Sequence, residues 1–173
     1  LALLPQASHD AFDYAVQDAV AAARFAWPDT GDKTQRVAAA LDAFDLGRLA
    51  TRPLQALSGG ERQRVALASV MAQDAPLILL DEPSNSLDLA HQAALQQQIG
   101  RWRAEGKAVL LVSHDLQLAP ACASHALLLD EHGAHRQYPL AELGAEHLAA
   151  VLGYPLTRLH HAGHPCFLPG HPS

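Results

Sequence analysis

The spacing of apolar residues changes about one third of the way along the chain. In the early part, apolar side chains recur every three or four positions, which is the spacing of a single helix face. This spacing predicts one helix from about Asp10 to Phe25, with Ser8 or Asp10 as its N-cap, and a second from Lys33 to Phe44. Ahead of them, the short apolar run Leu1–Leu4 is typical of a buried strand.

Beyond residue 57, short continuous apolar runs alternate with helical segments. The expected strands are residues 1–4, 77–80, 108–112 and 126–129. The expected helices are residues 57–73, 89–105, 115–123 and 142–152. Strands that are apolar on both faces and alternate with helices are typical of a parallel sheet covered on both sides. We therefore expect an α/β core with a helical block inserted into it, and a hairpin turn at residues 131–134.

Composition and charge exclude several classes of protein. The 173 residues are 49% apolar and 17% charged, which predicts a folded globular protein rather than a disordered one. The formal net charge of −6 argues against a nucleic-acid binder, and no apolar run approaches the roughly 18–20 residues of a membrane-spanning helix. Cys122 and Cys166 provide no disulfide framework and fit a reducing compartment. Because the chain starts at Leu1 rather than Met, we expect a fragment of a longer protein or a processed chain.

The segment Leu57–Glu61, with the sequence LSGGE, has two interpretations. Two glycines at the start of a helix let a ligand approach the backbone, and free amide groups there favour an anion such as phosphate. Ser58 and Glu61 also have the spacing of a capping box, in which each side chain accepts a hydrogen bond from the other residue's amide and no ligand is needed. The spacing alone leaves both interpretations open.

A pair of carboxylates comes directly after the apolar strand at residues 77–80. Adjacent charges repel each other and require solvent or a cation, and open α/β sheets bind ligands at the carboxyl ends of their strands. Asp81 is therefore a candidate Mg²⁺ ligand, and Glu82 a candidate group for orienting or deprotonating a water that attacks a phosphate. The alternative is that both residues only begin a loop and cap the next element.

Three further polar residues lie near the ends of predicted elements. His114 could hydrogen-bond a phosphate oxygen or hold a water, or it could be a loop residue between Ser113 and Asp115, which would cap the next helix. Gln6 lies just after the first strand and is a candidate for ligating Mg²⁺ or contacting the water. Asp88 could equally be the N-cap of the helix after it.

The tail after Gly153 has the residue types of a metal site without its spacing. Its candidate ligands are His160, His161, His164 and Cys166. These match no standard zinc framework. We interpret them as surface residues around a turn at Gly163 and Pro165.

In their order along the chain, five segments resemble the motif series of the ATP-binding-cassette (ABC) family. They are Leu4–Gln6 (the Q-loop), Leu57–Glu61 (the signature), Leu77–Pro83 (Walker B), Ser86–Asp88 (the D-loop) and Ser113–Asp115 (the H-loop). The resemblance covers about Leu1 to Gly153. It implies an α/β fold of the P-loop NTPase (RecA-like) type, whose parallel-sheet core is truncated at the N-terminus and carries an inserted α-helical subdomain.

The family's organisation divides the chain into four segments. Residues 1–6 would be the end of a core strand and the Q-loop, and residues 7–58 the helical subdomain. Residues 59–153 would be the signature helix and the second half of the ATPase core, and residues 154–173 a C-terminal tail. All four would belong to one incomplete nucleotide-binding domain.

The resemblance also implies a dimeric ATPase that holds two ATP molecules between its protomers. The residues that would contact the phosphates of ATP held mainly by the partner are Ser58, Gly59, Gly60 and Glu61. Asp81 and Gln6 would hold Mg²⁺, Glu82 the attacking water and His114 the terminal phosphate. Asp88 would lie at the nucleotide and protomer interface.

One departure from the family pattern bears on activity. The phosphate loop G-x-x-x-x-G-K-[ST] (Walker A) is absent, because Lys33 comes after Gly31-Asp32 and Lys107 after Glu105-Gly106. Without the backbone and the lysine of that loop, most of the binding to the β- and γ-phosphates is missing. We predict that this polypeptide alone neither holds ATP tightly nor hydrolyses it.

Two segments, Asp88–Gln92 and His114–Leu116, resemble the importers of metal chelates, namely corrinoids such as vitamin B12, ferric siderophores and haem. Among these we expect the corrinoid importer. The resemblance places the subunit at the cytoplasmic face of the membrane as a homodimer. Its helical subdomain would bind integral membrane permease subunits, which work with a substrate-binding protein, and no nucleic acid is expected.

Two other interpretations remain. ABC proteins of DNA repair or translation share the signature and Walker B, but the DNA-repair class inserts long coiled coils, and residues 7–56 show no sustained heptads. A naturally shortened, non-catalytic cassette is the second alternative. It would donate only its signature motif to an intact partner, and Glu82 would then be idle.

Overall fold

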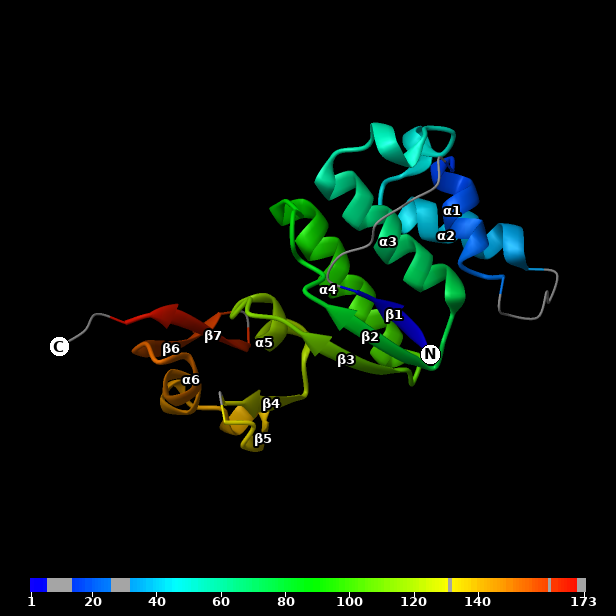
Figure 1. Cartoon of the computed structure of the whole chain (residues 1–173). Helices are drawn as coiled ribbons and strands as arrows, with labels where there is room; N and C mark the ends of the chain where they lie inside the picture. Colours follow the sequence, from blue (N-terminus) through cyan, green and yellow to red (C-terminus); the bar gives the residue numbers. More distant parts are fainter. Residues whose placement is uncertain (6–13, 26–31, 131, 162, 171–173) are drawn as a thin grey trace. The chain divides into compact units, whose positions relative to one another are not determined.

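The computed structural model describes residues 1–5, 14–25, 32–130, 132–161 and 163–170. They form two compact units, Leu1–Ser113 and His114–Ser173, and each is treated by itself (Figure 1). Among the described residues, no helix combines the length and the apolar composition that crossing a membrane requires.

The first unit is built on a parallel sheet of three strands, as the apolar runs predict. In the order β1-β2-β3 the strands are β1 (Ala2–Leu4), β2 (Leu77–Asp81) and β3 (Ala108–Val112). Leu3 pairs with Leu79, and Leu79 with Leu110. Strands far apart in the sequence are thereby neighbours, and β2 is central.

The two faces of this sheet differ in burial. The side chains of β1 and β2 that point to the helices are buried, namely Ala2, Leu4, Ile78 and Leu80. On the other face, Leu110 is 53% and Val112 55% exposed. Within this unit, α3 and α4 therefore cover one face of the sheet; coverage of the other face stays a prediction.

Helices α3 (Gly59–Gln73) and α4 (Leu89–Ala104) pack against the strands of this sheet (Figure 1). Helix α3 contacts β1, and α4 contacts β3. Their fully buried residues include Leu67, Leu95 and Trp102. Both helices agree with the predicted boundaries to within two residues, because Ser58 and Asp88 cap their N-termini with side-chain oxygens.

Two shorter helices, α1 (Val16–Ala22) and α2 (Lys33–Ala43), pack against α3 and form the predicted helical block. Helix α2 agrees with the predicted bounds to within one residue, whereas α1 begins at Val16 and not near Asp10. The reason is tertiary: Ala15 is extended and forms an isolated bridge with Pro53, so the helix cannot extend through it. The proposed caps Ser8 and Asp10 lie outside the described residues. Two 3-10 turns, η1 (Gly47–Leu49) and η2 (Leu54–Ala56), lead into α3.

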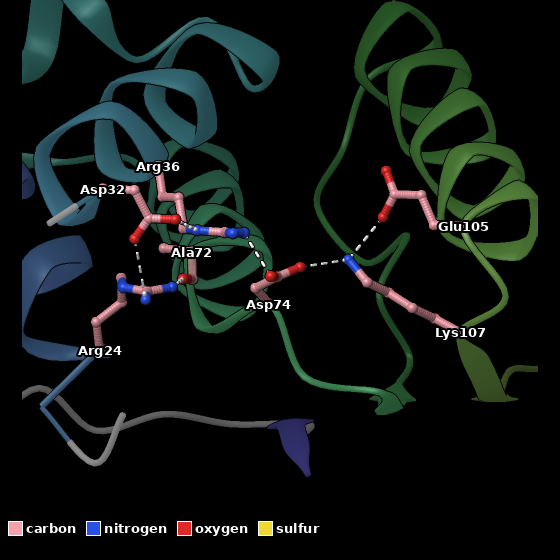
Figure 2. A network of polar contacts seen from close by, with 7 residues as sticks. All are labelled: Arg24, Asp32, Arg36, Ala72, Asp74, Glu105 and Lys107. Atoms are coloured by element: carbon pink, nitrogen blue, oxygen red, sulfur yellow. Dashed lines mark hydrogen bonds and ion pairs between the residues drawn. The ribbon is translucent and has the colours of Figure 1, made fainter. Parts of the chain in front are cut away.

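A network of charged side chains links the helical block to the base of the sheet (Figure 2). At its centre is Asp74, the C-cap of α3, in the left-handed conformation with φ 52°. Asp74 is bonded to Arg36 of α2 and, over 2.6 Å, to Lys107 just before β3. Asp32 forms ion pairs with both Arg36 and Arg24. Arg24 also donates to the carbonyl of Ala72, and Lys107 forms an ion pair with Glu105.

The second unit begins with α5 (Leu118–Cys122) and a hairpin of β4 (His125–Leu129) and β5 (His135–Pro139). Helix α5 starts later than the predicted residue 115, because the Asp115 side chain accepts hydrogen bonds from the amides of Gln117 and Leu118. The predicted hairpin turn is confirmed. The strand predicted at 126–129 is present as β4, and within this unit it pairs antiparallel with β5.

The last part of this unit differs most from expectation. A 3-10 turn η3 (Leu140–Glu142) precedes α6 (Ala145–Leu152), where one helix is predicted. The tail then forms a hairpin of β6 (Leu156–His161) and β7 (His164–Pro169). Its apolar residue Phe167 is 2% exposed and packs with Leu143 and Leu148. The tail histidines at 160, 161 and 164 are exposed, as predicted.

Candidate nucleotide site

The first turn of α3 carries the LSGGE segment, and both hydrogen bonds of a capping box are present. The Glu61 amide donates to Ser58 Oγ over 3.3 Å, and the Ser58 amide donates to Glu61 Oε2 over 2.7 Å. The hydrogen bond from the Ser58 backbone, followed by that from its side chain, lowers the pKa of Glu61. The capping interpretation is confirmed, and it leaves the Gly59 and Gly60 amides without a carbonyl of their own helix to bond.

A polar pocket of about 340 Å³ opens at this helix start. Its walls come from the first two turns of α3, from the segment between β2 and α4, and from the first turn of α4. The lining residues are Ser58, Gly60, Glu61, Arg64, Ser86, Leu87, Asp88 and His91. The fold therefore brings together four of the residues that sequence analysis singles out, Ser58, Gly60, Glu61 and Asp88, and Gly59 lies between two of them.

The two glycines differ in what surrounds them. A Cβ at Gly60 would lie 2.6 Å from the backbone oxygen of Ser86, which is closer than real Cβ atoms approach. A Cβ at Gly59 would meet only the Ser86 side chain, at 3.8 Å. The contact between α3 and the Ser86 backbone therefore requires a glycine at position 60 whether or not a ligand is bound.

Asp88 lines the pocket and caps α4 at the same time. Its Oδ1 accepts a hydrogen bond from the His91 amide over 2.9 Å and lies 2.7 Å from His91 Nδ1. The hydrogen bond from the His91 amide, then that from its ring, lowers the pKa of Asp88. His91 also lines the pocket; sequence analysis includes it in the importer-like segment Asp88–Gln92 but does not predict it as a site residue.

Asp81 and Glu82 lie at the carboxyl end of β2, outside the lining of this pocket. Asp81 is the last residue of the strand and pairs with Val112. Glu82 has φ 48°, a left-handed conformation that costs a residue with a side chain about 1–2 kcal/mol, and its amide donates to the Val112 carbonyl over 2.9 Å. Such strain is typical of functional positions where the surrounding structure over-determines the backbone.

Whether magnesium fits this strand end depends on what else supplies ligands. In the described part of the chain, no three His, Cys, Asp or Glu side chains are grouped so that they could hold a metal ion. Magnesium is commonly bound through one or two carboxylates, with phosphate oxygens and waters completing its coordination. The half-buried carboxylate of Asp81 therefore fits Mg²⁺ that arrives with a phosphate-bearing ligand.

Two predicted residues cannot be placed beside these groups. Gln6 lies outside the described residues. His114 is the first residue of the second unit and is exposed, so its position relative to Glu82 is not described. The assignment of both residues stays a prediction.

Two side chains of α3 connect the site to its surroundings, and sequence analysis singled out neither. Arg64 Nη1 donates to the carbonyls of Phe44 and Asp45, each over 2.8 Å, and so holds the end of α2. Gln63 Nε2 donates over 3.1 Å to the carbonyl of Pro83, next to Glu82. Their partners lie about 20 residues away in the sequence, where local spacing carries no signal.

Comparison with known proteins agrees with this geometry. The family model for the ABC transporter matches residues 1–85. The hemin import ATP-binding protein HmuV of Rhodococcus jostii (strain RHA1) is 40% identical over 165 residues, which are 92% of this chain and 56% of that protein. The protein of the same name from Pseudomonas entomophila (strain L48) is 40% identical over 177 residues, 97% of this chain and 69% of that protein.

A solved structure extends the likeness to three dimensions. An inward-facing conformation of a metal-chelate type ABC transporter matches with a TM-score of 0.80 at 30% identity, over 98% of this chain and 73% of that one. The α/β, P-loop NTPase type of fold is thereby confirmed. The chain spans little more than half the length of the Rhodococcus relative, 56%.

Proposed function

This chain belongs to the ABC transporter family, and we propose that it is part of the ATP-binding, ATP-hydrolysing subunit of an importer for a metal chelate. The observation that carries the proposal is the pocket in which the first turn of α3 meets the segment 86–88. Polar groups from two separate motifs line one concave site there, and the helix start favours an anion.

At this pocket, the amides of Gly59 and Gly60 and the hydroxyl of Ser58 would contact the phosphates of ATP. The nucleotide would be held mainly by the partner protomer of a homodimer. Glu61 would orient Ser58 through the capping box, and Asp88 would face the same nucleotide and the partner.

At the strand end, Glu82 would orient or deprotonate the attacking water, and Asp81 with Gln6 would hold Mg²⁺. The chemistry that Mg²⁺ supplies in phosphoryl transfer is neutralisation of the charge on the phosphate oxygens. His114 would contact the terminal phosphate. Asp81 and Glu82 lie outside the pocket at the start of α3. We therefore propose that this pair and the pocket residues serve different nucleotides of the dimer.

We propose haem as the compound imported, because the two relatives compared above carry the name hemin import protein. The corrinoid importer that the sequence suggests stays a prediction without support from these relatives. The subunit would lie at the cytoplasmic face of the membrane, and its residues 7–58 would bind the integral membrane permease subunits, with a substrate-binding protein acting on the other side.

Uptake tests this proposal most directly. In a strain deleted for the full-length gene, we expect uptake of radiolabelled hemin to be lost and to return with the wild-type gene. A Glu82→Gln gene should fail to restore uptake, since loss of a general base lowers turnover by about 10²–10⁴-fold. Exposed Glu142, changed to Gln, provides the control. Unchanged hemin uptake in the deletion strain would overturn haem as the cargo, and labelled cobalamin measured in parallel would test the corrinoid alternative.

A further inference from the structure

We propose that Gln63 is a positioning residue that couples the first turn of α3 to the backbone of Glu82. It would keep the Glu82 carboxylate oriented toward the attacking water, and Gln63 itself would contact neither the nucleotide nor the water. This inference rests on the proposed function, because it takes Glu82 as the group that handles the attacking water.

The segment from Glu82 to Asp88 has an unusual backbone. Glu82 and Ser86 both have left-handed φ values, 48° and 64°. Two hydrogen bonds within the segment fold it tightly, from the Asn85 amide to the Glu82 carbonyl over 3.2 Å and from the Leu87 amide to the Ser84 carbonyl over 3.1 Å. Residues with side chains keep such conformations only where their surroundings hold them.

Helix α3 holds this segment at two points. Gln63 Nε2 donates to the Pro83 carbonyl over 3.1 Å, and the backbone at Gly60 packs against the backbone of Ser86 too closely for a Cβ. Positions 60 and 63 are three residues apart and therefore lie on the same face of the helix. One face of the first turn of α3 thus contacts both ends of the stretch 83–86.

The bond to Pro83 constrains its neighbour because of proline geometry. The ring fixes the φ angle of Pro83, so only its ψ angle can still rotate between the bonded carbonyl oxygen and Glu82. On the other side, the Glu82 amide is bonded to the Val112 carbonyl of β3. Glu82 is therefore held between β3 and α3, and a shift of the first turn of α3 would move Pro83 and turn the Glu82 side chain.

The test uses the full-length gene product with the substitution Gln63→Met, which keeps the length of the side chain and removes its donor. Gln63→Lys keeps a donor and should restore the wild-type behaviour. Gln97→Met is the matched control, because Gln97 is exposed on α4. We expect kcat of the Gln63→Met protein to fall about five- to tenfold while KM for ATP stays unchanged. This is the effect of losing one hydrogen bond that matters for the reaction step and not for ATP binding.

Hydrogen exchange provides the second readout, and it needs no nucleotide. The amides of Asn85 and Leu87 should exchange about five- to tenfold faster in Gln63→Met than in the wild type or in Gln97→Met. Wild-type exchange at both amides would overturn the positioning role, as would equal changes in kcat and KM. If the wild-type protein does not hydrolyse ATP at all, the proposed function fails, and the exchange experiment still decides whether Gln63 holds the segment.

Discussion

Ser58, Gly59, Gly60 and Glu61 show how one short motif can serve both structure and ligand. The capping box uses the amides of Ser58 and Glu61 only. The two glycine amides between them belong to the first turn, where a helix leaves its donors unpaired. Capping and phosphate contact are therefore compatible at this helix, although sequence analysis treats them as alternatives.

The two glycines should respond differently to the same substitution. Gly60→Ala places a methyl group 2.6 Å from the Ser86 backbone oxygen, so α3 or the segment after β2 must shift. We expect a loss of about 1–3 kcal/mol in the free energy of unfolding, the usual cost of overpacking. Denaturant unfolding without nucleotide measures it.

Gly59→Ala is the control for that experiment. The added methyl group meets its nearest neighbour at 3.8 Å, an ordinary contact, and alanine favours the helix. Its free energy of unfolding should match or exceed that of the wild type. Equal destabilisation by both substitutions would contradict the close contact at Gly60.

The capping carboxylate makes a pH-dependent contribution to stability. Hydrogen bonds from Ser58 lower the folded-state pKa of Glu61 below its ordinary 4.5. A group with a lowered folded pKa stabilises the protein above its unfolded pKa, and the stabilisation is lost as pH falls through the folded value. We expect the wild type to be more stable than Glu61→Gln at pH 7, and the difference to shrink below pH 4.5. Urea unfolding of both proteins across this pH range measures the stability difference. A difference that does not depend on pH would exclude a stabilising role for the ionised Glu61 carboxylate.

At the scale of elements, the C-terminal end of α3 is joined to two other parts of the first unit by charge. Asp74 bonds Arg36 on α2 and Lys107 before β3 (Figure 2). Burial lowers the pKa of Lys107, but hydrogen bonds with Asp74 and Glu105 outweigh it and raise that pKa. The network therefore favours the charged lysine and ties the helical block to the sheet.

Asp74→Asn separates the charge of this residue from its backbone conformation. Asparagine tolerates the left-handed conformation at a helix C-terminus, so the substitution removes the charge and adds little strain. We expect a loss of about 1 kcal/mol, because partly exposed ion pairs are individually weak and this carboxylate serves two. Thermal unfolding at low and high salt measures it.

The dependence of this stability loss on salt concentration tests whether its cause is electrostatic. High salt screens partly exposed charges, so the gap between wild type and Asp74→Asn should narrow as salt is added. A double-mutant cycle that combines Asp74→Asn with Lys107→Met measures the interaction energy between Asp74 and Lys107. Additive losses in that cycle would show that the two side chains do not interact.

At the scale of the whole molecule, the 173-residue chain lacks the G-x-x-x-x-G-K-[ST] phosphate loop of its family. We predict that the purified chain neither binds ATP tightly nor hydrolyses it, since the cradle for the β- and γ-phosphates is missing. Phosphate release and calorimetric titration with ATP measure both properties. Turnover that Glu82→Gln abolishes would contradict the prediction and show that the chain suffices for catalysis.

The elements that sequence analysis predicted best are those whose signals are local. Helices α2, α3 and α4 have apolar periodicity, and the last two also have side-chain caps, so their bounds depend on neighbouring residues. The start of α1 depends instead on a distant residue, because the bridge from Ala15 to Pro53 joins residues far apart in the sequence. Sequence analysis predicts no strand in the β6–β7 hairpin, because the Pro, Gly and His residues between its apolar positions are typical of a loop.

By itself, the sequence determined the alternation of strands and helices in the first unit, the capping box at Ser58 and Glu61, and the motifs that identify the family, since each strand, cap and motif is carried by a short stretch of the chain. Only the tertiary structure decided which motifs share a pocket, that Gly60 must be a glycine, and that Gln63 reaches the residue after Glu82. It also decided that β4 pairs antiparallel with β5. The physical reason is that these features depend on contacts between residues far apart in the sequence, and the local pattern of side chains along the chain does not specify which distant residues meet.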